Sequence, residues 1–155
     1  LSVAANKGRP YGLKFAVPKK KNDRLYSAVA ELGLGLEDKM DIPVGLLSGG
    51  QRQAIALLMA TMTPISFLIL DEHTAALDPK TAEIIMKLTD RIVREKSLTA
   101  IMVTHNLRYA VEYGNRMLML HHGDIVLERK AAAKTETTVD DILSVFNEIS
   151  IECGN

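Results

Sequence analysis

The sequence has little of what marks secreted, membrane-spanning or nucleic-acid-binding chains. It contains one cysteine, Cys153, so no disulfide framework can form within the chain, and a reducing compartment is expected. No apolar run approaches the length of about 18 residues that spans a bilayer. The 19 lysines and arginines are balanced by 19 acidic residues, which argues against a general nucleic-acid binder, so no nucleic-acid partner is expected.

What the chain has instead is the composition of an ordinary soluble globule. Apolar residues make up 47% of the 155 positions and charged residues 25%, which excludes a disordered chain and suits one domain, with at most an added lobe. The chain begins with Leu1 and no signal-peptide pattern follows, so we expect a piece cut from a longer protein.

The hydrophobic pattern predicts helices before Gly50 and alternating helices and strands after it. We expect a helix capped by Asn22 and ended by Gly33, a solvated basic loop before it, and a connection at 35–45. The later elements that we expect are helices at 51–62, after Asp78-Pro79, at 107–113 and after Thr138, strands at 67–70 and 98–103, a hairpin of 116–120 with 124–128, and a linker around Ala131–Ala133.

Two glycines precede the helix expected at 51–62, in the string Leu47-Ser48-Gly49-Gly50-Gln51. Glycine allows close backbone approach, and the first turn of a helix presents free N–H groups and a positive dipole to an anion. The Ser48 hydroxyl adds a donor at the same edge. The string therefore predicts a phosphate-binding corner, and the alternative is a loop with ordinary helix capping.

Two acids, Asp71 and Glu72, follow the apolar run Phe67–Leu70, which we expect to form a buried parallel strand. The carboxyl ends of such strands are where α/β sheets bind ligands. Neighbouring side chains on a strand point to opposite faces, so one carboxylate can hold Mg²⁺ while the other polarises an attacking water. The alternative is a solvated strand end.

His105 follows the next expected strand, in Val103-Thr104-His105. The connection between Leu70 and Leu98 holds one helix, which favours parallel, neighbouring strands and would bring His105 to the same edge as the two acids. A lone histidine is more often structural, but this setting favours a functional role.

In their order and spacing these motifs resemble those of ATP-binding cassette (ABC) ATPases, over about residues 25 to 128. Leu47–Gln51 is similar to the signature motif of that family, and Phe67–Glu72 is similar to its Walker B strand with the catalytic glutamate. Ala75–Asp78 resembles the D-loop, and His105 stands where the family has its switch histidine. Four motifs in sequence are far more specific than any one of them.

The resemblance implies a dimer in which ATP lies between the Walker A loop of one subunit and the signature motif of the other. Ser48, Gly49 and Gly50 would contact the γ-phosphate in trans. Gln51 would lie near the nucleotide. Positioning and charge neutralisation dominate phosphoryl transfer, so such contacts carry much of the catalysis.

The resemblance also implies roles for the other four residues. Asp71 would support Mg²⁺, and Glu72 would act on the attacking water. Asp78 would communicate across the dimer, and His105 would contact the γ-phosphate.

Several features depart from the family pattern. His73 stands where proline is usual, and Ala75 stands where the D-loop usually begins with serine. No G-x-x-x-x-G-K-[ST] string occurs in the sequence. The Walker A loop, the nucleotide-stacking aromatic and the glutamine loop of the family would therefore lie upstream of Leu1.

The fold predicted from these patterns is α/β. It is a partial P-loop NTPase core of the ABC type with parallel strands flanked by helices, plus an α-helical subdomain on the N-terminal side. We expect residues 1–63 to form the helical subdomain with the signature motif, 64–130 the C-terminal half of the ATPase core, and 131–155 a linker and C-terminal helix. Without upstream strands, an open sheet edge would invite self-association.

The resemblance implies an ATP-binding subunit of an ABC transporter, an ATPase that couples ATP binding and hydrolysis at a dimer interface to transport. ATP and Mg²⁺ are the expected cofactors. The expected partners are a second ATP-binding subunit and transmembrane permease subunits, which would hold this cytoplasmic subunit at the inner face of the cell membrane. The chain alone is expected to be inactive.

Two alternatives come from other functional classes. The first is a non-transport ABC ATPase of the translation-factor type. An ABC ATPase of the chromosome-maintenance type is not favoured, because residues 1–46 show no heptad repeat. The second alternative is a non-catalytic module that supplies only its signature face to a complete cassette.

Overall fold

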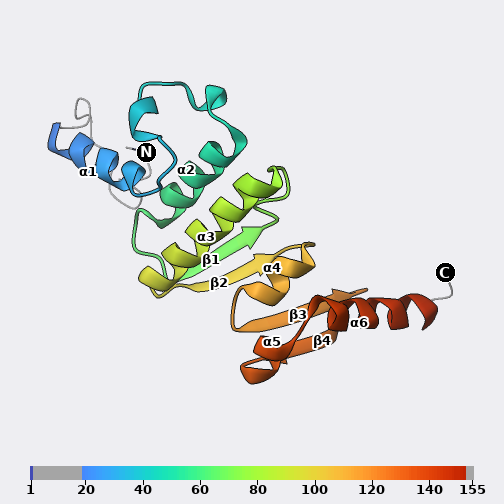
Figure 1. Ribbon diagram of the computed structural model, residues 1–155. Coiled ribbons are helices and arrows are strands. Elements are labelled where there is room, and N and C mark those ends of the chain that lie inside the picture. The colour runs from blue at the N-terminus through green and yellow to red at the C-terminus, as the bar shows by residue number, and fades with distance from the viewer. Residues whose placement is uncertain (2–18, 153–155) are drawn as a thin grey trace. The chain divides into compact units, whose positions relative to one another are not determined.

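The computed structural model describes residue 1 and residues 19–152, which divide into two compact units, Leu1–Met102 and Val103–Asn155. Helices and one two-stranded sheet make up each unit (Figure 1). Across the described ranges, no helix combines the length and apolar character that a membrane crossing requires. The three-part division expected from the sequence stays a prediction.

The first unit begins with α1 (Lys19–Ala30), followed by two 3₁₀ turns, η2 (Glu37–Lys39) and η3 (Val44–Leu46). It continues with α2 (Gly49–Thr61), β1 (Phe67–Asp71), α3 (Pro79–Glu95) and β2 (Thr99–Val103). β1 and β2 are neighbours and run parallel, with α3 as the crossover between them (Figure 1). The predicted parallel α/β arrangement is therefore confirmed.

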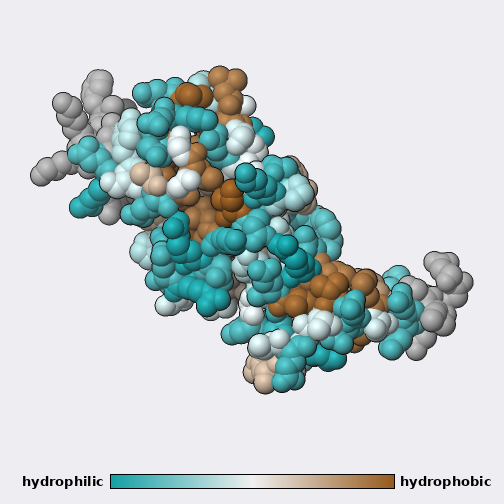
Figure 2. All heavy atoms as spheres, viewed as in Figure 1, coloured by the Kyte–Doolittle hydropathy of each residue, from teal (hydrophilic) through white to brown (hydrophobic). Residues whose placement is uncertain are grey.

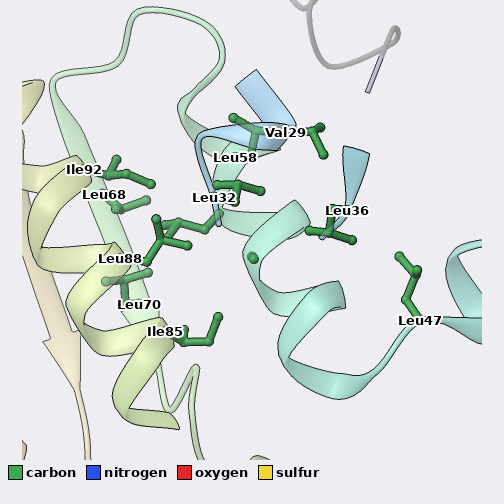
Figure 3. Close-up of a cluster of buried hydrophobic side chains, with 12 residues drawn as sticks. Val29, Leu32, Leu36, Leu47, Leu58, Leu68, Leu70, Ile85, Leu88 and Ile92 are labelled. Carbon is green, nitrogen blue, oxygen red and sulfur yellow. The ribbon is translucent and has the colours of Figure 1, made fainter. Parts of the chain in front are cut away.

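One hydrophobic cluster joins the helices of the first unit to one face of β1 (Figure 3). β1 contributes Leu68 and Leu70, and α3 contributes Ile85, Leu88 and Ile92, each at most 8% exposed. Fully burying one such side chain stabilises the fold by about 1.5–3 kcal/mol. This cluster fixes where β1 lies relative to α2. It therefore also fixes where Asp71 and Glu72 lie relative to Ser48.

β1 is buried on one face only, which differs from the buried strand predicted from the sequence. Leu68 and Leu70 point into the cluster, while Phe67 and Ile69 are 47% and 64% exposed. The physical reason is that the buried cluster formed with α2 and α3 includes only Leu68 and Leu70 of the strand, which point to one side of it. An apolar run in the sequence therefore does not by itself show that both faces of the strand are buried.

The second unit contains α4 (Leu107–Glu112), the antiparallel hairpin of β3 (Arg116–His121) and β4 (Asp124–Lys130), α5 (Ala132–Glu136) and α6 (Val139–Glu152). Met117, Leu127 and Ile142 form its core. Thr138 precedes α6, where its Oγ1 accepts from the Asp141 N–H and its own N–H donates to Asp141 Oδ2. The predicted hairpin and the predicted cap at Thr138 are confirmed.

Two local predictions are wrong. α1 begins at Lys19, inside the expected loop, so Asn22 lies within the helix and does not cap it. No glycine or proline occurs between Lys19 and Ala30, and lysine is a good helix former, so nothing stops the helix from starting early.

The linker expected around Ala131–Ala133 contains the start of α5. The buried Lys134 attaches α5 to α4 through a hydrogen bond from its Nζ to the Val111 carbonyl. The rest of the expected basic loop, and Cys153, lie outside the described residues.

Candidate functional site

Ser48 forms the N-cap of α2, the capping role that the sequence analysis gave as the alternative, and the phosphate-binding role of this corner stays a prediction. Its side-chain Oγ accepts from the Gln51 N–H at 3.3 Å, and Gln51 Oε1 accepts from the Ser48 N–H at 3.2 Å, which completes a capping box. Ser48 is exposed. A helix start with an exposed hydroxyl offers donors and a positive dipole to an anion.

The two glycines of the corner serve a packing purpose that the sequence did not reveal. A β-carbon on Gly49 would meet Leu77 Cδ2 at 3.0 Å, and one on Gly50 would stand 2.2 Å from Thr81 Cγ2. The glycines therefore allow the first turn of α2 to approach the segment that leads into α3. No sequence signal connects Gly50 with Thr81, because the contact depends on how the two helices pack.

The two acids lie at the end of β1, as expected, but only Asp71 belongs to the strand. Glu72 follows it with φ 42, in the left-handed region that non-glycine residues rarely adopt. Its carbonyl accepts from the Ala75 N–H at 3.0 Å, which starts the turn toward α3. Strained backbone of this kind is concentrated at functional sites.

A groove of about 550 Å³ in the first unit is lined by the two acids and by one residue of the signature corner, Ser48–Gln51. Gly49, Asp71 and Glu72 all line it. The other lining residues come from α2, β1 and the turn after β1 (Arg52, Gln53, Ala56, Leu57, Ala60, Leu68, Ile69, Leu70, His73, Ala76, Leu77). Of the residues predicted from the sequence, Gly49, Asp71 and Glu72 line this groove, whereas Ser48, Gly50 and Gln51 are not among its lining residues.

The carboxylates suit Mg²⁺ chemically. Mg²⁺ prefers oxygen ligands and usually takes one or two carboxylates, with phosphates and waters completing its shell. Asp71 and Glu72 are both exposed and line the groove, so oxygen donors of the right kind are available there. No group of three or more metal-ligating side chains occurs in the described part of the chain.

Asp78 is the N-cap of α3, with Pro79 at the first helical position as the sequence predicted. Its Oδ1 accepts from the Thr81 N–H at 3.0 Å. Hydrogen bonding from Thr81, through its side chain and its backbone, holds the pKa of the Asp78 carboxyl below its ordinary value. Asp78 therefore has a local capping role, and its predicted role across a dimer stays a prediction.

His73 fills the position where the sequence departs from the family pattern. Its Nε2 lies 3.2 Å from Thr89 Oγ1 on α3, and Thr89 Oγ1 itself donates to the Ile85 carbonyl. Burial lowers the pKa of His73, which favours the neutral ring. His73 thus attaches the turn after Glu72 to α3.

His105 lies in the second unit, two residues after the end of β2. It is exposed, and the next residue, Asn106, caps α4 through its side-chain oxygen. His105 thus stands in the short connection between β2 and α4. Its predicted contact with a γ-phosphate stays a prediction.

Comparison with known proteins shows what the chain is similar to. The family model described as ABC transporter matches residues 1–75. A tyrosine transport ATP-binding protein of Clostridioides difficile is 48% identical over 146 residues, covering 94% of this chain and 58% of the relative. A methionine import ATP-binding protein, MetN 2, of Bacillus cereus is 35% identical over 144 residues, covering 89% of this chain and 42% of the relative. The chain thus spans about three fifths or less of these relatives.

Solved structures share the fold. A dimeric post-hydrolysis state of the ATP-binding cassette MJ0796, bound to ADP and Pi, matches with a TM-score of 0.61 and 28% identity, covering 77% of this chain and 50% of that one. The ADP conformation of the ATP-binding cassette MJ1267 matches with a TM-score of 0.67 over 94% of this chain and 54% of that one. At 21% identity, the second match shows the fold alone.

Proposed function

Because the chain belongs to the family of ABC transporter ATP-binding subunits, we propose that it works within such a subunit, where ATP binding and hydrolysis at a dimer interface drive transport. The observation that carries this proposal is that the chain exposes Ser48 at the N-cap of α2 and the carboxylates of Asp71 and Glu72 at the end of β1, so that it could contribute to two different nucleotide sites of a dimer. Donors for phosphate and carboxylates for a metal and a water therefore lie in one compact unit.

The surface beside Ser48 supports a role in contact with another subunit. Val44 and Leu46 in η3 are 56% and 78% exposed, and brown apolar atoms appear at the surface over the loop that leads into α2 (Figure 2). Exposed apolar side chains grouped beside polar donors are typical of protein interfaces. We propose that this face meets the partner subunit, with Ser48 directed toward the partner's nucleotide.

We propose distinct tasks for the two acids. Asp71 would hold Mg²⁺, which supplies charge neutralisation to the phosphates when it is bound. Glu72 would accept a proton from the attacking water, and His105 would donate a hydrogen bond to the γ-phosphate. The positive φ of Glu72 fixes the direction in which its side chain leaves the strand end.

The chain alone should neither bind ATP tightly nor hydrolyse it. The lysine and backbone loop that hold the β- and γ-phosphates in this family are absent from its sequence. Titration with a fluorescent ATP analogue and a phosphate-release assay test this expectation. Micromolar binding or clear turnover by the isolated chain would contradict it.

Trans complementation tests the signature role directly. In the C. difficile relative, the serine of its own signature motif is replaced by arginine. This variant serves as the partner subunit, and its homodimer should be inactive. Adding this chain should restore hydrolysis at one composite site, where the partner supplies the nucleotide loop and this chain supplies Ser48. We call this the trans assay. No hydrolysis above that of the partner alone would overturn the proposed role of Ser48.

A chimera separates the two remaining possibilities. Joining the rest of the C. difficile protein to this chain, in place of its own matching residues, tests whether Glu72 and His105 are catalytic in their own subunit. A non-catalytic module would be active in the trans assay and inactive in the chimera. A complete ATPase half would be active in both.

We propose that the cargo is an amino acid and that permease subunits hold the protein at the inner face of the cell membrane. The names of the two relatives, tyrosine transport and methionine import, support the choice of cargo. The chimera should restore tyrosine uptake to cells that lack the C. difficile subunit but contain its permease. If uptake is restored for another class of solute instead, the cargo is not an amino acid.

A further inference from the structure

Three neighbours hold the side-chain amide of Gln51 within the first unit. Its Nε2 donates to the Leu34 carbonyl oxygen at 3.1 Å, while its Oε1 accepts from the Ser48 N–H at 3.2 Å and from Lys39 Nζ at 3.3 Å. Gln51 was expected near the nucleotide, but its amide is occupied inside the chain. The contact with Lys39 connects η2 to the first turn of α2.

Lys39, the Ser48 N–H and the Leu34 carbonyl together fix which way the amide points. An ammonium group has donors only, so the amide atom that faces it must be the oxygen. The same oxygen accepts from the Ser48 N–H and closes the capping box. A flipped amide would set its NH₂ group against two donors and would leave the Leu34 carbonyl facing an oxygen. The hydrogen bond from Lys39 has a charged donor, and at 3.3 Å it is the longest of the three contacts.

The closed capping box in turn orients the Ser48 hydroxyl. Ser48 Oγ accepts from the Gln51 N–H at 3.3 Å. With that lone pair in use, the hydroxyl proton remains available to donate outward, toward an anion at the exposed start of α2. Without the Gln51 side chain the Ser48 backbone N–H would lose its acceptor, and the looser Ser48 backbone would add an ordering cost to phosphate binding.

We propose that Lys39 is a positioning residue for the phosphate-binding corner, acting through the Gln51 side chain on the Ser48 backbone that carries the hydroxyl. Lys39 does not touch the phosphate in this proposal. The inference rests on the proposed function, because the trans assay is where its consequence for ATP is measured. It goes beyond that function by giving a role to a residue outside the motifs predicted from the sequence.

The test replaces Lys39 by Met, which keeps the length of the side chain and removes its donors. In the trans assay Lys39→Met should raise the KM for ATP about five-fold, the equivalent of one hydrogen bond, with a nearly unchanged maximal rate. Lys39→Arg retains a donor and should restore the wild-type KM to within about two-fold. Lys87→Met is the matched control, because Lys87 pairs with Glu83 on the exposed face of α3 and should leave KM unchanged.

A purely structural role for Lys39 would give a different pattern. The maximal rate and the melting temperature would fall together as the folded fraction falls, and KM would stay the same; this result would overturn the proposal. In the proposed network, Gln51→Met should have the same effect on KM as Lys39→Met, and the double variant should show no further increase. Full additivity of the two substitutions would also overturn it.

A measurement on the chain alone keeps this inference separate from the proposed function. If the wild-type chain shows no activity in the trans assay, the proposed function fails, but the network is still testable by NMR on the ¹⁵N-labelled chain. Lys39→Met should speed hydrogen exchange of the Gln51 side-chain amide several-fold, whereas Lys87→Met should not. Equal exchange in wild type and Lys39→Met would overturn the network itself.

Discussion

A β-carbon placed on Gly50 would lie 2.2 Å from Cγ2 of Thr81, so the first turn of α2 fits against α3 only because position 50 has no side chain. Real β-carbons do not approach a neighbour this closely. The contact joins the signature corner to the helix that Asp78 caps. Any change at position 50 therefore alters both the local packing and the placement of the corner.

Gly50→Ala should destabilise the chain by about 1–3 kcal/mol, because one of two packed segments must move. The better helix propensity of alanine, worth about 1 kcal/mol, offsets only part of this cost. Urea unfolding measures the change. Gly45→Ala is the matched control, since nothing lies within 4 Å of its β-carbon position.

Thr81→Ser removes the methyl group that clashes and keeps the backbone N–H that Asp78 accepts from. In the Gly50→Ala background it should recover most of the lost stability. If Gly50→Ala proves as stable as wild type, the close approach of α2 and α3 is not what requires glycine at this position.

Local patterns in the sequence predicted most elements, because periodicity and caps are local properties. The cap at Ser48, the proline after Asp78 and the hairpin around Gly123 each depend on residues that are neighbours in the chain. The one-sided burial of β1, the contact of Gly50 with Thr81 and the contact of Lys39 with Gln51 depend on packing between segments. No pattern within one segment encodes them.

In the candidate site, too, some features follow from the local sequence and others depend on packing between segments. The residue types at the end of β1 and at the start of α2 predicted phosphate and metal chemistry from the sequence. The positive φ of Glu72 was not foreseen, because it arises from the turn that connects β1 to α3 under tertiary constraint. The contact of His73 with Thr89 was also not foreseen, since a histidine in a turn is as often exposed.

Ser48→Asp separates capping from phosphate binding. Aspartate is as good an N-cap as serine, so the free energy of unfolding should change by less than about 0.5 kcal/mol. The added negative charge would face the phosphate, so activity in the trans assay should be lost. Ser48→Asn, an uncharged cap, should keep more activity than Ser48→Asp. Equal activity of the aspartate variant and wild type would remove Ser48 from the phosphate site.

Leu46→Glu tests the apolar face beside the corner. Leu46 is 78% exposed, so a charge there should leave the stability of the chain nearly unchanged. It should raise the concentration of chain needed for half-maximal activity in the trans assay by about ten-fold, as for a central interface residue. Leu120→Glu is the control, because Leu120 is 65% exposed on β3 in the second unit. Similar effects of both substitutions would argue against a specific interface at η3.

Substitutions of Glu72 test its chemistry and its backbone strain together. In the chimera, Glu72→Gln should keep ATP binding and lose most hydrolysis, because the proton acceptor is gone while Asp71 remains. Glu72→Asn should also be inactive but more stable than Glu72→Gln, by about 0.5–1 kcal/mol, because asparagine tolerates the left-handed region. Unchanged turnover in Glu72→Gln would remove Glu72 from its proposed role.

Lys134 should make the stability of the second unit depend on alkaline pH. Its side chain is 3% exposed, and burial lowers the pKa of its ammonium group from the ordinary value of 10.5. Between the lowered pKa and 10.5 the unfolded chain binds more protons than the folded chain, so the free energy of unfolding rises with pH in that window. The gain is complete above pH 10.5 and is lost as the pH falls through the lowered pKa.

Lys134→Met has no such group, so wild type should gain stability relative to this variant as the pH approaches 10.5. Parallel stability curves for the two proteins, measured by urea unfolding across this range, would show that the Lys134 pKa is not perturbed by burial.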